Sequence, residues 1–401
     1  MTAVLPRRAF LAGAASVGGL GLAGCATGRA VPGPVPIVTP GLRAPPPLAA
    51  VRADIDRLSH ISVCLRPFRK AGPRLEVETV GDKRVVHNYG HGGSGWSLSW
   101  GSGEIAARYA LEDGARDIAV IGCGALGLTT ATLLQRAGAT VTIYARERMF
   151  EARSSRATGT WSPDSRIAAA DAVSPSFADQ WERMTRTSHR IFQTYLGLPG
   201  DPVEWTDRYT LFDAPGTWTG APRPAERVNF LHLGARVRDL QPRSTEQPAG
   251  SHPFPVAKVL RGASMQFNIA AYARLLATEF QLGGGRIEAM TFNTPAEFAG
   301  LRQKVIVNCT GYGARALWKD DSIIPVRGQI AWLIPQPEVD YGLFYRDVAM
   351  LSRADGMVVQ YVGSSEMWGY GDDREEVDRA EAEAAVKTLA DLYARIPIGR
   401  A

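Results

Sequence analysis

Three glycines at the start of an expected helix are spaced for binding a phosphate group. They lie in the motif GCGALG at residues 122–127, which follows a short apolar strand expected at residues 118–121. In such a strand–turn–helix unit, Gly122 makes the tight turn, Gly124 lets the backbone approach a pyrophosphate, and Gly127 lets the helix pack against the strand. The free N–H groups at the helix N-terminus then face the phosphates. The spacing predicts a dinucleotide cofactor bound by Gly122, Gly124, Ala125 and Gly127.

The end of the next apolar strand, at residues 140–145, leaves the identity of the dinucleotide open. An acidic residue usually closes this strand and accepts hydrogen bonds from the ribose hydroxyls. Here Arg146 comes first and Glu147 follows it. Either Glu147 binds the ribose, or Arg146 binds a phosphorylated ribose, which would indicate NADP. The motif alone does not distinguish NAD, NADP and FAD.

Two further segments favour a flavin. A β-branched strand at residues 304–309 runs into the sequence TGYG, which is how a late strand of an FAD-binding domain ends. The stretch SSRATGTW at residues 154–161 follows the second strand closely and is polar and rich in small residues, which suits a segment that passes beside a flavin. Its candidate cofactor-binding residues are Ser154, Ser155 and Gly159.

The bulk composition is that of an ordinary globular protein. The chain has 401 residues, of which 45% are hydrophobic and 21% charged, enough for two lobes with separate cores. The net charge of +5 comes without any Lys/Arg block, so nucleic-acid binding is not expected. The spacing of the four cysteines and six histidines indicates no metal site and no disulfide framework. His87 and His91 are interpreted as structural.

The N-terminus reads as an export signal over residues 1–24. A basic pair, Arg7-Arg8, precedes a weakly apolar run, which resembles the twin-arginine route that carries folded, cofactor-loaded proteins. The run is shorter than the roughly 20 residues that a transmembrane helix needs. Leu22-Ala23-Gly24-Cys25 resembles a lipobox, in which Cys25 would be lipidated; the alternative is cleavage near Ala26.

A proline-rich stretch at residues 25–48 reads as an extended tether, and folding is expected to begin near Ala49. Together with the signal, it predicts an exported protein on the periplasmic side of the membrane, anchored as a lipoprotein through Cys25.

Five blocks of sequence, taken together, resemble the D-amino acid oxidase family of FAD-dependent oxidoreductases. They are LRPFRKAGPRLEVE, HNYGHGGSGWSLSWG, VIGCGALGL, VNCTGYGA and PVRGQIAWL. In that family the first two blocks come last, whereas here they stand ahead of the glycine motif. The chain therefore resembles a circular permutant of the family, with the family's last helix joined to its first strand through residues 112–116.

The resemblance implies an α/β fold in two interleaved parts. One is a Rossmann-like FAD-binding domain, discontinuous in sequence, expected at residues 81–165 and 256–324. The other is an antiparallel β/α substrate domain, expected at residues 49–80, 166–255 and 325–401.

The resemblance also implies roles for individual residues. Arg74 matches an arginine that binds the substrate carboxylate bidentately. A tyrosine that caps this carboxylate corresponds to Tyr341 or Tyr345, of which Tyr345 is the chosen candidate; Arg346 is interpreted as solvent-facing. The backbone N–H groups of one loop would face the flavin and stabilise negative charge on its reduced ring. That loop contains Gly92, Gly93, Ser94, Gly95 and Ser97.

Three functions remain open from the sequence. The first is FAD-dependent oxidative deamination of a D-amino acid, by hydride transfer from Cα to the flavin, with oxygen or a membrane quinone as the final acceptor. The second is an NADP-linked reductase that uses Arg146. The third is a non-catalytic, lipid-anchored relative.

Overall fold

The computed structural model describes residues 48–217, 220, 225 and 227–396. The predicted export signal lies outside the described residues, as does the predicted tether up to residue 47. Within the described part of the chain, no helix is both long and apolar enough to cross a membrane.

A six-stranded sheet forms the part of the fold that contains the glycine motif. Its strand order is β2-β3-β10-β4-β5-β9, with β2 antiparallel to β3 and the other neighbours parallel. The strands are β2 (Val77–Val80), β3 (Lys83–His87), β10 (Val305–Asn308), β4 (Asp117–Ile121), β5 (Thr140–Ala145) and β9 (Arg286–Ala289). The predicted strand–helix–strand unit is confirmed, with α2 (Ala125–Arg136) between β4 and β5.

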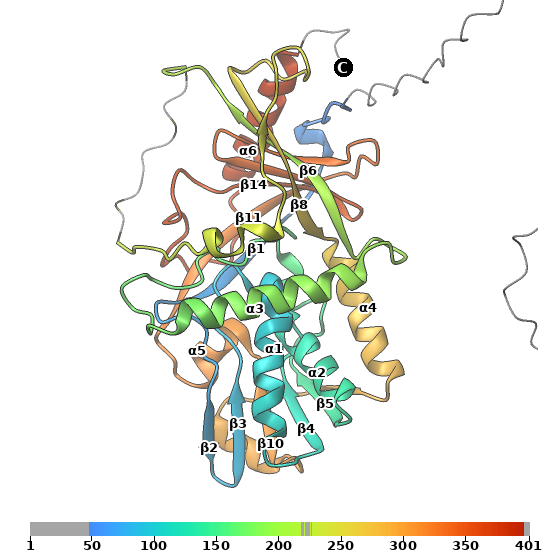
Figure 1. The fold of residues 1–401 in the computed structure, drawn as a ribbon, viewed down its shortest axis with the longest axis vertical. Helices are drawn as coiled ribbons and strands as arrows, with labels where there is room; N and C mark the ends of the chain where they lie inside the picture. Colours follow the sequence, from blue (N-terminus) through green and yellow to red (C-terminus); the bar gives the residue numbers. More distant parts are fainter. Residues whose placement is uncertain (1–47, 218–219, 221–224, 226, 397–401) are drawn as a thin grey trace, which may run out of the picture. The chain divides into compact units, whose positions relative to one another are not determined.

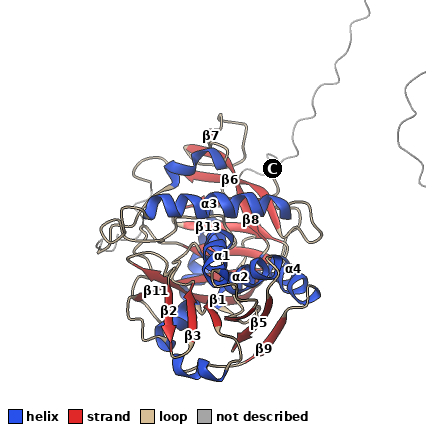
Figure 2. Cartoon of the chain, turned by 60° about the horizontal axis from the view of Figure 1, so that its bottom comes forward, coloured by secondary structure: helices blue, strands red, loops and turns tan. Residues whose placement is uncertain are grey.

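The inner strands β10, β4 and β5 are buried on both faces, as parallel strands usually are, whereas the edge strands β2 and β9 are largely exposed. Ile118 and Val120 of β4 pack into one hydrophobic cluster, while Ala119 and Ile121 pack into another. Three helices, α1 (Gly95–Leu111), α2 and α4 (Ile269–Leu282), lie side by side over one face (Figures 1 and 2). Short helical segments cover the other face: η5 (Pro295–Gly300) and α5 (Ala314–Leu317).

An eight-stranded, mostly antiparallel sheet forms the rest of the fold. Its order is β1-β11-β14-β13-β12-β6-β8-β7, and only the β12–β6 pair is parallel. The strands are β1 (Leu58–Arg69), β11 (Ile323–Leu333), β14 (Gly356–Tyr361), β13 (Val348–Arg353), β12 (Tyr341–Tyr345), β6 (Val203–Phe212), β8 (Lys258–Phe267) and β7 (Thr245–Glu246). Helix α6 (Arg379–Ala394) packs its apolar side on this sheet. The remaining 3₁₀ turns are η1 (Ile55–Arg57), η2 (Arg153–Arg156), η3 (Gln193–Tyr195), η4 (Gly234–Leu240) and η6 (Gly311–Gly313).

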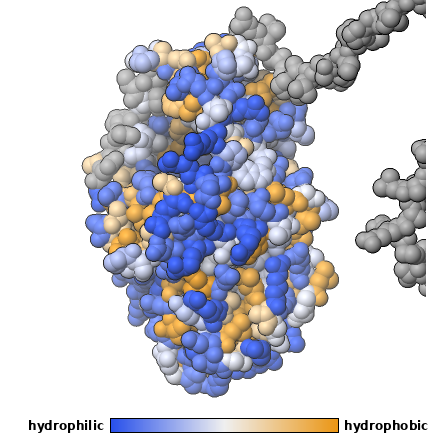
Figure 3. All heavy atoms as spheres, viewed as in Figure 1, coloured by the Kyte–Doolittle hydropathy of each residue, from blue (hydrophilic) through white to orange (hydrophobic). Residues whose placement is uncertain are grey.

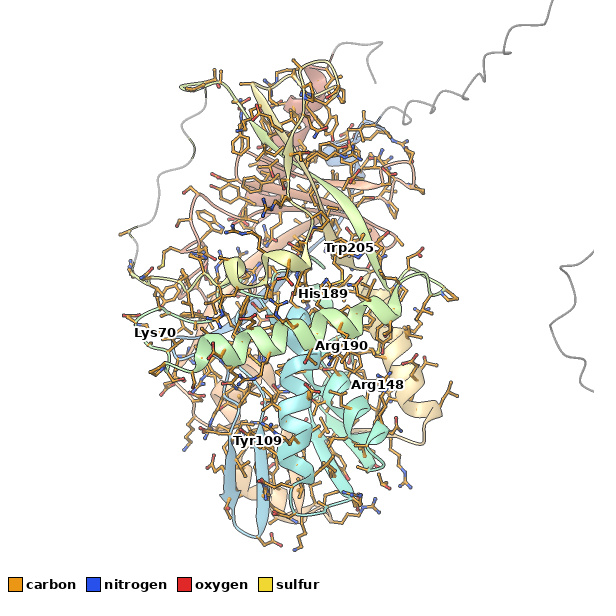
Figure 4. All side chains as sticks on the ribbon, in the orientation of Figure 1. Lys70, Tyr109, Arg148, His189, Arg190 and Trp205 are labelled. Atoms are coloured by element: carbon orange, nitrogen blue, oxygen red, sulfur yellow. The ribbon has the colours of Figure 1, made fainter. Side chains whose placement is uncertain are left out.

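Helix α3 (Phe177–Phe192) packs across α1. One side of this helix is buried and apolar, and the other side is polar. It buries Trp181 and Met184, and hydrophilic side chains gather over its outer side (Figure 3). Figure 4 shows His189 on α3 and Trp205 on β6, whose ring centroids are 6.2 Å apart. The helix therefore contacts both α1 and the eight-stranded sheet.

Two strands belong to a different sheet from the one that the expected domain boundaries imply. β2 belongs to the six-stranded sheet, although it falls in the segment 49–80 that was expected in the substrate domain. β8 belongs to the eight-stranded sheet, although it falls in the FAD-binding segment 256–324. Both sheets draw on segments from early and late in the sequence, as the interleaved fold predicted.

The two ends of the described body meet at Tyr341. Its hydroxyl donates a hydrogen bond to the carbonyl of Ala49 at 2.7 Å and lies 2.7 Å from the hydroxyl of Tyr393 on α6. β3 and α1, which precede β4 in sequence, are inserted beside β10 and α2.

Candidate functional site

A cavity of about 290 Å³ opens at the carboxyl ends of the parallel strands. Ligands of open parallel sheets bind at this edge because the loops that follow the strands converge there. The residues after β3, β4, β5, β9 and β10 form one wall, and β1, β11 and β14 of the eight-stranded sheet contribute the other. Its lining includes Cys64 to Pro67, His91 to Gly93, Gly95, Trp96, Gly122 to Leu126, Tyr144 to Glu147, Ala152 to Ser154, Arg156 to Thr158, Met290 to Phe292, Cys309 to Gly313, Gly328, Ile330 and Gln360.

The predicted phosphate-binding turn lines this cavity. Gly122 has a φ of +106°, and a Cβ there would stand 2.6 Å from the carbonyl oxygen of Cys309. Both the backbone conformation and the neighbouring strand therefore require glycine. Gly124 is the N-cap of α2 and provides no capping side chain, so the first-turn N–H groups after that of Ala125 are left available to an anion.

Ser154 ties the start of α2 to the start of α1. Its hydroxyl accepts a hydrogen bond from the backbone N–H of Ala125 at 3.1 Å, and its carbonyl accepts one from the indole of Trp96 at 2.8 Å. Ser154, Ala125 and Trp96 all line the cavity. The start of the segment 154–161 thus lies beside the glycine turn.

Arg146 and Glu147 lie at the cavity wall beyond β5 and pair with each other. The guanidinium of Arg146 donates to the carboxylate of Glu147 at 2.8 Å. This pairing reduces the charge that Arg146 could offer to a phosphorylated ribose, while Glu147 keeps acceptor capacity for hydroxyl groups.

Backbone hydrogen bonds hold the second glycine loop in place. The N–H of Gly92 donates to the carbonyl of Pro67 at 2.9 Å, and the N–H of Gly93 donates to the carbonyl of Ser165 at 2.9 Å. Gly92, Gly93 and Gly95 line the cavity, but the N–H groups of Gly92 and Gly93 are bonded to these carbonyls and do not face a flavin, contrary to the role inferred for the loop. Ser94 and Ser97 do not line the cavity. The Ser94 hydroxyl donates to the Ser165 carbonyl at 3.1 Å, and the Ser97 hydroxyl accepts from the N–H of Ser162 at 2.9 Å, so both brace the loop from behind.

Three other predicted cofactor residues support the cavity without lining it. A Cβ on Gly127 would overlap the carbonyl of Gly122, so this glycine allows α2 to approach β4. The hydroxyl of Ser155 donates to the carbonyl of Phe150 at 2.9 Å. Gly159 has a φ of +89° and packs against the backbone of Phe267.

Arg74 lies outside the cavity, contrary to the role inferred for it. Arg74 follows β1, and its backbone forms an isolated antiparallel β-bridge with that of Tyr89. Its guanidinium donates to Glu76 at 2.5 Å, to Glu78 at 3.0 Å and to the hydroxyl of Tyr89 at 3.1 Å. A guanidinium with two carboxylate partners has little capacity left for a substrate carboxylate. The geometry therefore gives Arg74 a bracing role in the β2–β3 hairpin.

Tyr345 also lies away from the cavity. Its hydroxyl donates to the carboxylate of Asp213 at 3.0 Å and accepts from Arg395 at 2.5 Å. Arg346 donates to the same carboxylate at 2.6 Å, so it is paired and not free in solvent. Tyr341 bridges the two ends of the body. Neither tyrosine is positioned to cap a substrate in the cavity.

Four arginines line the cavity, and Arg66 is the one of them that has no carboxylate partner among the described residues; it lies in the same block of sequence as Arg74. It lies on β1, where Cys64 and Arg66 share one face, and burial lowers the pKa of its guanidinium. It donates to the backbone carbonyl of Arg327 at 3.2 Å, and its guanidinium lies against Gly328, where a Cβ would overlap it. Cys64, Leu65, Arg66 and Pro67 all line the cavity, so alternation along the strand gives no signal that singles out Arg66.

Four more lining residues were missed or interpreted as structural. Cys64 donates its thiol to the carbonyl of Arg153 at 3.4 Å, and burial raises the pKa of this thiol against the opposing charge of Arg66. The guanidinium of Arg153 lies over the ring of Tyr312, 5.2 Å from its centroid. Arg156 donates to the carbonyl of Val63 at 3.2 Å.

The two histidines of the loop have different environments. The ring of His87 bonds to Glu78 and to Asn308, which agrees with a structural role. His91 lines the cavity, is 1% exposed, and neither ring nitrogen has a hydrogen-bond partner among the described residues. Burial lowers its pKa to about 3, so the ring is neutral at physiological pH.

These features fit an FAD molecule. The uncapped start of α2 suits its pyrophosphate, and Glu147 suits its ribose. The unpartnered nitrogens of His91 and the buried Nε of Arg153 are polar atoms that a bound cofactor can satisfy.

Comparison with known proteins agrees with this assignment. The family model described as "DAO: FAD dependent oxidoreductase" matches residues 117–400, which is more than half of the chain. The D-amino-acid oxidase of Rubrobacter xylanophilus is 28% identical over 292 residues, covering 69% of this chain and 77% of that protein. The D-amino-acid oxidase of Streptomyces coelicolor is 30% identical over 221 residues, covering 53% of this chain and 58% of that protein.

Among solved structures, glycine oxidase from Geobacillus kaustophilus is similar with a TM-score of 0.45 and 12% identity, covering 70% of this chain and 78% of that one. L-amino acid deaminase from Proteus vulgaris gives a TM-score of 0.44 and 14% identity, covering 70% and 74%. The match to the family model and the glycine-lined cavity together lead to one conclusion: the chain belongs to the DAO family of FAD-dependent oxidoreductases, and FAD is its cofactor.

Proposed function

We propose that this enzyme oxidises a D-amino acid to the corresponding imino acid, with Arg66 binding the substrate carboxylate. The observation that carries the proposal is a half-buried guanidinium on the cavity wall that has no carboxylate partner among the described residues. A buried charge without a counter-ion is costly, so the cavity favours an anionic ligand at this point. The two relatives named above are D-amino-acid oxidases, which supports the D configuration.

The residues around the cavity have distinct tasks in this reaction. Bound FAD supplies the acceptor for the hydride that leaves the substrate Cα. Arg66 orients the substrate through two parallel N–H···O bonds to its carboxylate, a geometry that lysine does not reproduce. Gly92 and Gly93 bring the backbone next to the same wall, and Ile330 and Trp96 contribute apolar surface that limits water.

The test is anaerobic reduction of the flavin by a panel of D- and L-amino acids, which is independent of whether oxygen or a quinone is the final acceptor. We expect Arg66→Ala to keep its FAD and to lose reduction by roughly 100-fold, since hydrogen bonds to a charged group contribute about 3 kcal/mol. Arg66→Lys should recover part of the rate.

Arg74→Ala separates the two candidate arginines. It should keep substrate reduction while lowering thermal stability, because it removes the brace between Glu76, Glu78 and Tyr89. Loss of reduction in Arg74→Ala, with normal rates in Arg66→Ala, would overturn the assignment of Arg66.

We infer further that the chain is a circular permutant of its family. The family model matches from residue 117 onward, whereas β3 and α1 stand ahead of that point and complete the cofactor wall. The contact of Tyr341 with both ends of the described body supports this inference, since joined ends must lie close together.

A further inference from the structure

Gln360 is a polar residue in the wall that the eight-stranded sheet contributes to the cavity. It lies on β14, lines the cavity and is only 4% exposed. β14 stands between β11 and β13 in the interior of the sheet, where a residue presents its side chain to the space above the sheet. The group that Gln360 offers to a ligand in the cavity is therefore its carboxamide.

The strand register places Gln360 on the same face of the sheet as Ile330. Val359 pairs with Ala331, and both pack into the hydrophobic cluster on the side that α6 covers. Gln360 and Ile330 come next on their two antiparallel strands, so their side chains point to the opposite face. The ladder between β11 and β14 ends at the pair of Ala331 and Val359. Ile330 and Gln360 thus stand together where the two strands open onto the cavity.

The carboxamide of Gln360 has no hydrogen-bond partner in the described part of the chain. Two other buried glutamines of the same sheet do have partners: Gln266 donates to the carbonyl of Ser352 at 2.7 Å, and Gln329 donates to the carbonyl of Asp378 at 2.7 Å. A carboxamide can donate two hydrogen bonds and accept two. Its capacity at residue 360 is left for whatever fills the cavity.

Gln360 also stands at a suitable separation from Arg66. The guanidinium of Arg66 lies against Gly328, which is two residues from Ile330 on β11. From the rise of about 3.4 Å per residue and the strand spacing of about 4.8 Å, the positions of Gly328 and Gln360 in the sheet are roughly 8 Å apart. An amino acid whose carboxylate is bound at one of these positions can therefore reach the other with a short side chain.

We propose that Gln360 selects the substrate side chain, so that this enzyme prefers D-amino acids with an uncharged polar side chain, a hydroxyl or a carboxamide, over apolar ones of the same shape. The inference rests on the proposed function, in which Arg66 binds the α-carboxylate. An apolar side chain covers the carboxamide of Gln360 and leaves it unpaired, whereas a polar one bonds to it. Gln360 is neutral, so it provides no counter-ion for a charged side chain.

The experiment compares substrates of equal shape in the FAD-loaded protein. Anaerobic flavin reduction is measured with two pairs, D-asparagine against D-leucine and D-threonine against D-valine. We expect the polar member of each pair to be favoured in the wild type by about 10-fold or more in kred/Kd.

Two glutamine variants test the residue itself. Gln360→Met keeps an unbranched side chain of similar length and removes the carboxamide, so the preference for the polar member should fall by about 10-fold or more. Gln281→Met changes an exposed glutamine on α4 that does not line the cavity, and it should keep the wild-type preference.

A binding measurement gives a readout that is independent of turnover. Succinamate and 4-methylpentanoate have the shapes of asparagine and leucine without the amino group. Each is titrated into the oxidised protein, and the shift in the flavin absorption spectrum reports binding. Succinamate should bind at least about 10-fold more tightly in the wild type, and the difference should disappear in Gln360→Met.

The outcomes separate the two proposals. If no amino acid reduces the flavin, the proposed function fails, and the two titrations alone then decide whether Gln360 recognises a polar group. If polar and apolar members of each pair are equivalent in the wild type, this inference is overturned while the proposed function stands. If Gln360→Met weakens both members of each pair equally, Gln360 contacts a group that all amino acids share, and its role in selecting the side chain is ruled out. The wild-type preference needs no variant, so a variant that fails to fold does not protect the proposal.

Discussion

The absence of a side chain at Gly328 determines which conformation the side chain of Arg66 can adopt. Gly328 on β11 faces the guanidinium of Arg66, and β1 pairs with β11 so that Cys64 lies opposite Gly328. Any side chain at residue 328 would occupy the space of the guanidinium. The conformation of the arginine that we propose to bind the substrate is therefore set from the neighbouring strand.

We expect Gly328→Ala to weaken substrate binding more than it weakens the fold. The added methyl group must push the guanidinium of Arg66 aside, which costs roughly 1–3 kcal/mol. Anaerobic titration should show a substrate Kd raised by about 5- to 150-fold, with FAD content unchanged. Gly300→Ala, where a Cβ meets no atom within 4 Å, is the matched control. An unchanged Kd in Gly328→Ala would contradict this account.

His91 should make the protein sensitive to acid. Its pKa is about 3 in the folded state against 6.5 in the unfolded chain, so the unfolded state binds more protons between these values. Stability from this group is complete above pH 6.5 and is lost as the pH falls below it, by about 2 kcal/mol at pH 5. Urea unfolding at pH 7 and pH 5 should show a smaller loss in His91→Gln than in the wild type. Equal losses in both proteins would show that another group controls the transition.

At the scale of elements, the sequence predicted the strand–helix–strand unit that carries the glycine turn, but it did not predict that Arg66 lines the cavity. β4, α2 and β5 follow from a local pattern of apolar residues and glycines, and they formed as expected. Arg66 and Arg74 lie in one block of sequence, and only the tertiary fold sends Arg66 to the cavity with β1 and Arg74 to the β2–β3 hairpin. Tyr345 failed as a candidate for the same reason, since its partner Asp213 comes from the segment after β6.

The crossing of α1 and α3 depends on Gly101. A Cβ there would overlap the backbone of Met184, and the N–H of Gly101 donates to the hydroxyl of Ser188 at 2.8 Å. Gly101→Ala should lower the free energy of unfolding by about 1–3 kcal/mol, because the two helices must move apart. Urea unfolding of this variant beside Gly300→Ala measures the effect. Equal stability of the two variants would mean that the crossing adjusts without cost.

At the scale of the whole molecule, the permutation inference predicts that the chain can be reopened. A chain that begins at Ala115, joins residue 396 to residue 48 by a short Gly/Ser linker, and ends at Glu112 should fold and bind FAD. The new ends fall in the exposed connection between α1 and β4, where a Cβ added to Gly114 would meet no atom within 4 Å. Flavin content and melting temperature test this. As a control, a chain reopened after Asn308, at the cofactor end of β10, should lose FAD. If the chain that begins at Ala115 does not fold or does not bind FAD, the permutation inference is contradicted.

The membrane anchor is a prediction from sequence that concerns residues outside the described ones. If Cys25 is lipidated, Cys25→Ala should move the protein from the membrane fraction to the soluble fraction of the periplasm. Fractionation of cells that express each form decides the matter. Identical fractionation would show that Cys25 is removed with the signal or is not modified.

The pairing of β1 with β11 has a consequence for when the enzyme becomes complete. β1 spans residues 58–69, and its partner strand spans residues 323–333. During synthesis the first strand must wait for most of the chain before it finds its neighbour. The cavity wall that contains Arg66 and Gly328 therefore closes late, and a newly made chain exposes its glycine turn before that wall exists. We expect stable binding of FAD to require both strands, so a chain that stops before residue 323 should not retain the flavin.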